Sequence, residues 1–352
     1  MARFITLLTD FGPAQIYIGI MKGVIGSLNA QATIVDLSHA VEPQNVLEGA
    51  FLLHTAYEFF APDTVHVAIV DPAVGSERRA VALKTPFGIF VGPDNGVLSY
   101  VVDRVAEAAP GGVELAIQER TLRPEAEAVV LTQPRFWRHP VSHTFHGRDI
   151  FSPVAAHLSL GVPLNLFGEP TRILRAYVLP KPRSIPSGVE GHILHIDRFG
   201  NLISNLAPED LPEGQPVVTV SGVEVRGFVR YYAEADDLMA LIGASGYLEV
   251  AVRNGSAEAR LGTRRGDTVQ VRAGEESITY QRPDPGPPLR RPRRLAANPP
   301  PSSSSSLPPA PEDAGRVAGH LGDIARGPQQ RDERGRGEPL ANRPASIQTQ
   351  QP

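Results

Sequence analysis

The sequence contains no cysteine among its 352 residues. This absence excludes structural disulfides, thiolate zinc sites and a cysteine nucleophile. No apolar run reaches the roughly 20 residues that a membrane-spanning helix needs. The first residues, MARFITLLTDFG, also lack the basic region, long apolar core and cleavage site of a signal peptide. We therefore expect a soluble, cytoplasmic protein with no membrane partner.

Residues 281–352 lack the residue types that build a core. They contain no aromatic residue, 15 of the 34 prolines and a run of five serines. Such a segment cannot bury enough apolar surface to offset the entropy of ordering it, so we expect a disordered tail. The tail carries 11 Arg and 7 acidic residues, which leaves 23 basic and 31 acidic residues in the rest of the chain. An acidic core argues against nucleic acid as a partner.

The first half of the chain alternates apolar strands with helical patterns. The spacing predicts helices over residues 15–28 and 46–60, and strands over 4–9, 32–38, 65–70, 80–85 and 88–93. Strands that alternate with helices of this length indicate a mostly parallel sheet covered on both faces. We expect an α/β domain over residues 1–180.

The second part of the chain follows a proline-rich join at residues 178–186. Short β-type runs such as GHILHI, VVTVSG and YLEVAV recur here, and no long helical pattern interrupts them. This pattern predicts a smaller all-β barrel domain over residues 186–278, within the usual range of domain sizes.

The stretch DPAVGSERR, residues 71–79, carries the strongest chemical signal in the first domain. It follows a buried strand, and the carboxyl ends of parallel strands are where ligands bind. Gly75 permits a sharp turn that brings Arg78 back toward Asp71, and an Arg within reach keeps the carboxylate ionised and oriented. An ordinary ion pair that pins the turn would have the same sequence.

Two other strand ends carry polar residues. Asp10 follows the first strand, where its two oxygens could accept hydrogen bonds from a sugar diol or cap the next helix. Asn95 lies in the motif PDNG, which turn chemistry alone would explain. In a parallel sheet these groups can converge although the chain separates them.

A histidine-rich segment, residues 133–151, holds His139, His143 and His146. Their spacing differs from that of a zinc-binding helix, and Pro140 and Gly147 are expected to break any helix here, so we expect no metal site. His146 lies in a tight, irregular stretch that suits a side chain displayed at an active site.

Six motifs follow one another along the chain: TDFG, DPAVGSERR, PDNG, TFHGRDIF, DRFGNLISN and RNGSA. Taken together and in this order, they resemble one family, the S-adenosyl-L-methionine hydroxide adenosyltransferases, which are relatives of the fluorinating and chlorinating enzymes. The resemblance covers about residues 3–275.

The resemblance implies an α/β domain joined to a β-barrel, and homotrimers whose sites lie between the α/β domain of one subunit and the barrel of the next. Asp71, Arg78 and His146 would form the set that activates water. The expected substrate contacts in this domain are Asp10, for the ribose hydroxyls, Asn95 and Phe145.

The resemblance also assigns residues of the barrel. Asp197, Asn201 and Ser245 would hold the methionine amino and carboxylate groups, and the turn at Asn254 and Gly255 would meet the adenine edge. The implied reaction is hydrolysis of S-adenosyl-L-methionine, the substrate, to adenosine and L-methionine, with no metal and no cofactor.

Two alternatives remain open at this stage. A halogenase would place a Tyr at the position of Asp71 and a Ser at the position of Gly147, and an anionic carboxylate there repels halide. A non-catalytic sensor of S-adenosylmethionine would have no need of a water-activating set. Ala73, where the family usually has Gly, and Arg253, where Asn is common, depart from the family pattern.

Overall fold

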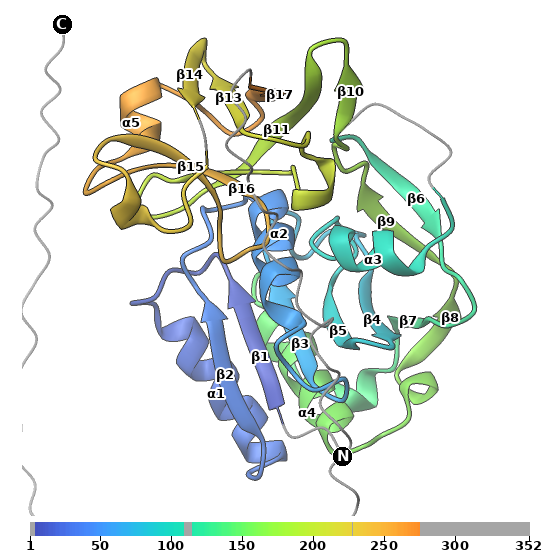
Figure 1. The fold of residues 1–352 in the computed structure, drawn as a ribbon. Coiled ribbons are helices and arrows are strands. Elements are labelled where there is room, and N and C mark those ends of the chain that lie inside the picture. Colours follow the sequence, from blue (N-terminus) through green and yellow to red (C-terminus); the bar gives the residue numbers. More distant parts are fainter. Residues whose placement is uncertain (1–3, 109–114, 227, 275–352) are drawn as a thin grey trace, which may run out of the picture. The chain divides into compact units, whose positions relative to one another are not determined.

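The computed structural model describes residues 4–108, 115–226 and 228–274, drawn in colour in Figure 1. These residues form an α/β part followed by a barrel-like β part, and the predicted fold class is confirmed. The tail expected at residues 281–352 lies outside the described residues. The domain limits near residues 180 and 186 stay a prediction.

A mixed seven-stranded sheet forms the centre of the first part. Its strand order is β2-β1-β3-β5-β4-β7-β8. The strands are β1 (Phe4–Thr9), β2 (Thr33–Ser38), β3 (Val65–Ile69), β4 (Ala80–Thr85), β5 (Gly88–Pro93), β7 (Glu127–Leu131) and β8 (Gly168–Thr171). A separate antiparallel pair joins β6 (Ile117–Thr121) and β9 (Ile173–Tyr177).

The parallel arrangement expected for this sheet holds for half of it. Strands β2, β1, β3 and β5 pair in parallel. Strands β4, β7 and β8 pair antiparallel, which makes the sheet mixed. The reason is the short connection between Thr85 and Gly88, because a two-residue link can join only antiparallel strands.

Helices cover both faces of this sheet. On one face, α1 (Ile16–Leu28) and α4 (Ser152–Ser159) pack against a core that contains Leu7. On the other, α2 (Val46–Tyr57) and α3 (Ser99–Val105) share a core with Leu8. Neighbouring residues of a strand point to opposite faces, so β1 contributes to both cores. Among the described helices, none is long and apolar enough to cross a membrane.

The second part is an eight-stranded antiparallel sheet with its own core. Its strand order is β14-β13-β17-β11-β12-β16-β15, and β10 also pairs with β11. The strands are β10 (Arg183–Ile185), β11 (Gly188–Ile196), β12 (Leu202–Ser204), β13 (Pro216–Val220), β14 (Val223–Arg226), β15 (Leu238–Ile242), β16 (Leu248–Val252) and β17 (Thr268–Ala273). One short helix, α5 (Ala257–Leu261), begins at a Ser256 cap.

The barrel contacts the α/β part through helix α2. The ring nitrogen Nε2 of His54 lies 3.0 Å from the hydroxyl of Tyr247, in the turn before β16. Arg265 pairs with Glu48 at 3.1 Å. These two contacts join residues that lie about 200 positions apart in the sequence.

A core substitution tests this packing. Leu7 lies in β1 and is fully buried in the core that the sheet shares with helices α1 and α4. We expect Leu7→Ala to lower the free energy of unfolding by about 2–5 kcal/mol, because the removed side chain leaves a cavity. The measurement is chemical denaturation.

Leu160→Ala is the matched control, since Leu160 is 42% exposed. It should change the free energy of unfolding by less than about 1 kcal/mol. Equal losses in the two variants would contradict the placement of Leu7 in the core.

Candidate active site

The turn after β3 brings Arg78 back to Asp71, as its sequence predicts. The Nε atom of Arg78 lies 3.0 Å from both carboxylate oxygens of Asp71, and its Nη2 atom lies 2.5 Å from Oδ2. The two side chains are only 5% and 6% exposed. Such a charge-assisted contact with several hydrogen bonds fixes both groups.

Gly75 makes this turn possible. Its φ of +80° lies in the left-handed region, and a Cβ atom there would lie 2.2 Å from the backbone oxygen of His143. The turn that carries Asp71 and Arg78 therefore packs directly on the segment that leads to His146. Only glycine permits this close approach of two backbones.

His146 completes the cluster from a distant part of the sequence. Its Nδ1 atom lies 2.8 Å from Nη2 of Arg78. A guanidinium only donates hydrogen bonds, so Nδ1 accepts, and the imidazole is neutral with its proton on Nε2. Burial lowers the pKa of His146 below its ordinary value, and the charge of Arg78 lowers it further. The structure thus brings Asp71, Arg78 and His146 together.

The segment that follows His146 is helical, which corrects the expectation that Gly147 breaks any helix here. Residues Gly147–Phe151 form a π-helical turn that continues directly into α4. Ser152 supports it by donating to the backbone oxygen of Gly147. Single π-helical turns are frequent at functional sites.

Within the described residues, no cluster of three or more His, Asp or Glu could hold a metal ion.

Asp10 lies at the end of β1, next to the strand that carries Asp71. Its Oδ2 atom accepts from the backbone N–H of Gln44 at 2.8 Å, just before α2. Helix α1 begins at Ile16, and no side chain caps its N-terminus, so Asp10 does not cap it. Its other carboxylate oxygen leaves one acceptor for a ligand.

Phe145 packs in an aromatic cluster beside this strand end. Its ring lies edge-on to Phe11, with ring centres 6.0 Å apart, and to Tyr17, at 5.1 Å. The side chain is mostly buried. The cluster links the Asp10 turn to the segment of His146.

Asn95 forms hydrogen bonds to the backbone just after β3 and to the backbone of its own turn. It donates to the backbone oxygen of Val70 at 2.8 Å and accepts from the N–H of Val97. These bonds use one of its two N–H donors and one lone pair of its oxygen. The residue before it makes a contact that was not predicted: buried Asp94 accepts from Arg79 at 2.8 Å. Arg79, the second Arg of DPAVGSERR, was the sequence feature from which this ion pair could have been predicted.

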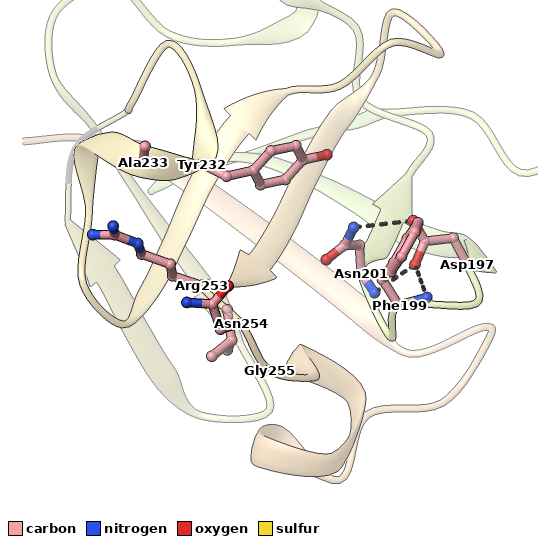
Figure 2. A pocket seen from close by; sticks show the side chains of 9 residues that line it. Asp197, Phe199, Asn201, Tyr232, Ala233, Arg253, Asn254 and Gly255 are labelled. Atoms are coloured by element: carbon pink, nitrogen blue, oxygen red, sulfur yellow. Dashed lines mark hydrogen bonds between the residues drawn. The ribbon is translucent and has the colours of Figure 1, made fainter.

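The barrel contains a pocket of about 740 Å³ (Figure 2). Its lining includes predicted residues and others that the sequence analysis missed: Asp197, Phe199, Asn201, Tyr232, Ala233, Val252, Arg253, Asn254 and Gly255. Asp197 accepts from the side chain of Asn201 at 3.0 Å and from its backbone N–H at 2.9 Å. Figure 2 shows this pair on one side and Tyr232, Arg253 and Asn254 on the other.

Two aromatic residues of the pocket were not predicted. Phe199 is 76% exposed, and Tyr232 is also exposed. Exposed aromatic rings at a pocket with both polar and apolar lining suit a flat, partly polar ligand. Phe199 lies inside the motif DRFGN, so its place between Asp197 and Asn201 was the signal that could have identified it.

Ser245 lies apart from these residues. It occupies the turn between β15 and β16, at the opposite end of β16 from Asn254, and is not among the residues that line the pocket. Its hydroxyl is buried and has no hydrogen-bond partner among the described residues. Within one chain, the structure does not bring Ser245 to the pocket.

Apart from Ser245, the predicted residues form two separate groups. None of Asp71, Arg78 and His146 lines the barrel pocket. One group, which includes Asp71, Arg78 and His146, lies at the edge of the α/β sheet, and the other lines the pocket in the barrel.

Comparison with known proteins gives the same family for both parts. Residues 5–168 match the family described as SAM hydroxide adenosyltransferase N-terminal domain, and residues 191–270 match its C-terminal domain. The chain is 37% identical to a Salinispora tropica protein named (R)-S-adenosyl-L-methionine hydrolase, over 77% of this chain and 98% of that protein. A fluorinase from Actinoplanes is 28% identical over 59% of this chain and 72% of the enzyme.

A solved structure supports the likeness. The crystal structure of an uncharacterized conserved protein from Thermotoga maritima superimposes with a TM-score of 0.67 at 31% sequence identity. The match covers 76% of this chain and 99% of that chain.

Gly75 provides a test of the geometry. We expect Gly75→Ala to cost more than about 1 kcal/mol of unfolding free energy, because the Cβ strains a left-handed residue and also overlaps the backbone of His143. The measurement is chemical denaturation.

Gly161→Ala is the matched control. Gly161 has a similar φ of +87°, but a Cβ there meets nothing within 4 Å. Gly161→Ala should lose only the strain energy of a left-handed residue, about 1 kcal/mol of unfolding free energy. If Gly75→Ala costs no more than this control, the close packing of the two segments is wrong.

Proposed function

Because the chain belongs to the SAM hydroxide adenosyltransferase family, we propose that it hydrolyses S-adenosyl-L-methionine to adenosine and L-methionine. The observation that carries the proposal is the contact of Arg78 with both Asp71 and His146. The Salinispora tropica relative is named for the (R) form of the substrate. We propose the same sulfonium configuration for this chain.

The proposed reaction is a displacement at the ribose C5′ atom. The water oxygen forms a bond to C5′ while the bond from C5′ to sulfur breaks. The electron pair of the broken bond stays on sulfur, which becomes the neutral thioether of methionine. The sulfonium is already a good leaving group, so the reaction needs an aligned nucleophile more than an acid. No cofactor enters this scheme.

The three clustered side chains would align that water. His146 is neutral and presents its Nε2 proton, which can donate to the water oxygen. The carboxylate of Asp71 keeps lone pairs for a water proton, and Arg78 stabilises the hydroxide character that develops during attack. Since Nδ1 of His146 is engaged by Arg78, the proposal assigns the water proton to Asp71.

The barrel pocket would hold the rest of the substrate. Phe199 and Tyr232 suit the faces of the adenine ring, and the turn at Asn254 and Gly255 suits its edge. Oδ2 of Asp197 accepts from the side chain of Asn201 and keeps a second lone pair, which suits the methionine ammonium. Asp10 would bind the ribose hydroxyls. The methionine role of Ser245 has no support from its position in one chain.

Water is favoured over halide by one observation. Asp71 places a nearly buried negative charge where the nucleophile would lie. A carboxylate repels fluoride and chloride but accepts a hydrogen bond from water.

The separation of the two residue groups supports a site shared between copies. Asp71, Arg78 and His146 do not line the barrel pocket of their own chain. We propose that the cluster of one subunit faces the barrel pocket of another in a homotrimer. A cytoplasmic location, like the trimer, remains a prediction.

The reaction is tested by its products. Purified protein is incubated with the (R) and (S) forms of S-adenosylmethionine, without and with chloride or fluoride, and the nucleosides are identified by mass spectrometry. We expect adenosine and methionine, preferentially from the (R) form. Asp71→Asn should slow this reaction at least about 100-fold, because the acceptor for the water proton is lost.

Binding measured by calorimetry is the control for Asp71→Asn, which should still bind the substrate. Unchanged turnover in this variant would refute the role of Asp71. A 5′-halogenated adenosine would instead identify a halogenase, and bound but unconverted substrate in the wild type would identify a sensor.

A mixing experiment tests the shared site. Asp71→Asn damages only the cluster, and Asp197→Ala damages only the barrel pocket. When the two inactive proteins are unfolded and refolded together, about a quarter of the sites in random head-to-tail trimers would combine an intact cluster with an intact pocket. We expect activity to return to about that fraction of the wild-type value. No recovery in mixed trimers, or an active monomer in sedimentation, would contradict the proposal.

A further inference from the structure

Asp149 is a buried carboxylate in the π-helical turn, three residues after His146. Its side chain is fully buried. It accepts from Arg148 through Nε at 2.6 Å and Nη2 at 2.7 Å, and from the backbone N–H of Ser142 at 2.8 Å. Burial by itself raises the pKa of Asp149, but the hydrogen bonds from Arg148 and Ser142 outweigh it, and the pKa lies below its ordinary value. Asp149 is therefore ionised at neutral pH.

These contacts close the loop of residues 138–149 at its base. The N–H of Arg138, at the start of the loop, donates to the backbone oxygen of Asp149 at 2.8 Å, and its side chain reaches the carboxylate at 3.4 Å. Ser142 attaches the middle of the loop to the same carboxylate. The buried side chain of Asp149 thus contacts three residues of the loop that contains His146: Arg138, Ser142 and Arg148.

The loop held in this way is the one that packs on the catalytic turn. The backbone oxygen of His143 lies where a side chain on Gly75 would begin. A shift of the loop would therefore change the distance between His146 and Arg78. The ion pair of Asp71 and Arg78, by contrast, lies within its own turn.

We propose that Asp149 is a positioning residue for the reaction at Asp71, Arg78 and His146, because it ties the loop of residues 138–149 to the turn that carries His146. This inference rests on the proposed hydrolysis. Asp149 acts through His146 and does not itself touch the substrate.

The pKa of His146 distinguishes positioning from a simple charge effect. Burial and then Arg78 are the largest influences on this pKa, and both lower it. Asp71 and Asp149 raise it by smaller amounts, and His143 lowers it slightly. If Asp149 acted only through its charge, removing that charge would lower the pKa further. If Asp149 positions the loop, its removal exposes His146, separates it from Arg78 and raises the pKa toward its ordinary value.

The experiment compares Asp149→Asn with the wild type in adenosine release across the pH range. Activity requires neutral His146, so it falls as the pH drops through the pKa of this residue. We expect kcat at neutral pH to fall by about ten- to hundredfold, as for a small misplacement of a catalytic group. We also expect the acidic limb of the profile to move to higher pH, with KM close to that of the wild type.

Asp103→Asn is the matched control. Asp103 lies in helix α3, and its carboxylate pairs with the buried Arg120 at 3.0 Å. The kcat and acidic limb of Asp103→Asn should stay those of the wild type. If Asp149→Asn does not fold, Arg148→Lys replaces it, because Lys keeps the charge but cannot form the two parallel bonds. It should show smaller changes in the same directions. An acidic limb that stays in place or moves to lower pH would overturn the proposal.

A second readout does not depend on turnover. The imidazole signal of His146, identified with His146→Gln, is titrated by NMR in the wild type and in Asp149→Asn. We expect a higher pKa in the variant, and an equal or lower one would overturn the positioning role. If the wild type releases no adenosine, the proposed function fails, while this titration still tests the inference.

Discussion

The guanidinium of Arg78 joins two groups that come from different parts of the chain. It holds the carboxylate of Asp71 within one turn and the imidazole of His146 across 68 residues. Because a guanidinium only donates, it sets the imidazole in one neutral tautomer and donates to both oxygens of the carboxylate. The other features of the cluster serve this contact: Gly75 lets the two segments meet, and the π-helical turn presents His146.

The fold explains why Asp71, Arg78 and His146 gather at one place. Strands β1 and β3 are parallel neighbours, so Asp10 and Asp71 leave the same edge of the sheet. The segment of His146 reaches this edge because α4 packs beneath the sheet in the same core as Leu7 and Phe145. The barrel supplies a separate pocket. The cluster of Asp71, Arg78 and His146 and the barrel pocket therefore lie in different folded parts.

Local sequence determined much of this protein. Strand β1 has the predicted bounds, and the helices α1 and α2 lie within the predicted segments, because apolar periodicity records which face of an element is buried. The return of Arg78 to Asp71 was also predictable, since both lie in one turn with a glycine at its corner. Six short motifs in a fixed order indicated the family, and the matches over both parts of the chain confirm it.

Only the tertiary structure decided the contacts between distant segments. The sequence could not show that β7 and β8 extend the sheet in antiparallel pairs, because strand direction depends on which partners meet. It predicted a break at Gly147, where packing against α1 instead supports a π-helical turn. The sequence also could not show that Ser245 lies outside the barrel pocket of its own chain. Local patterns record burial and turn chemistry, whereas the meeting of residues far apart depends on packing of the whole chain.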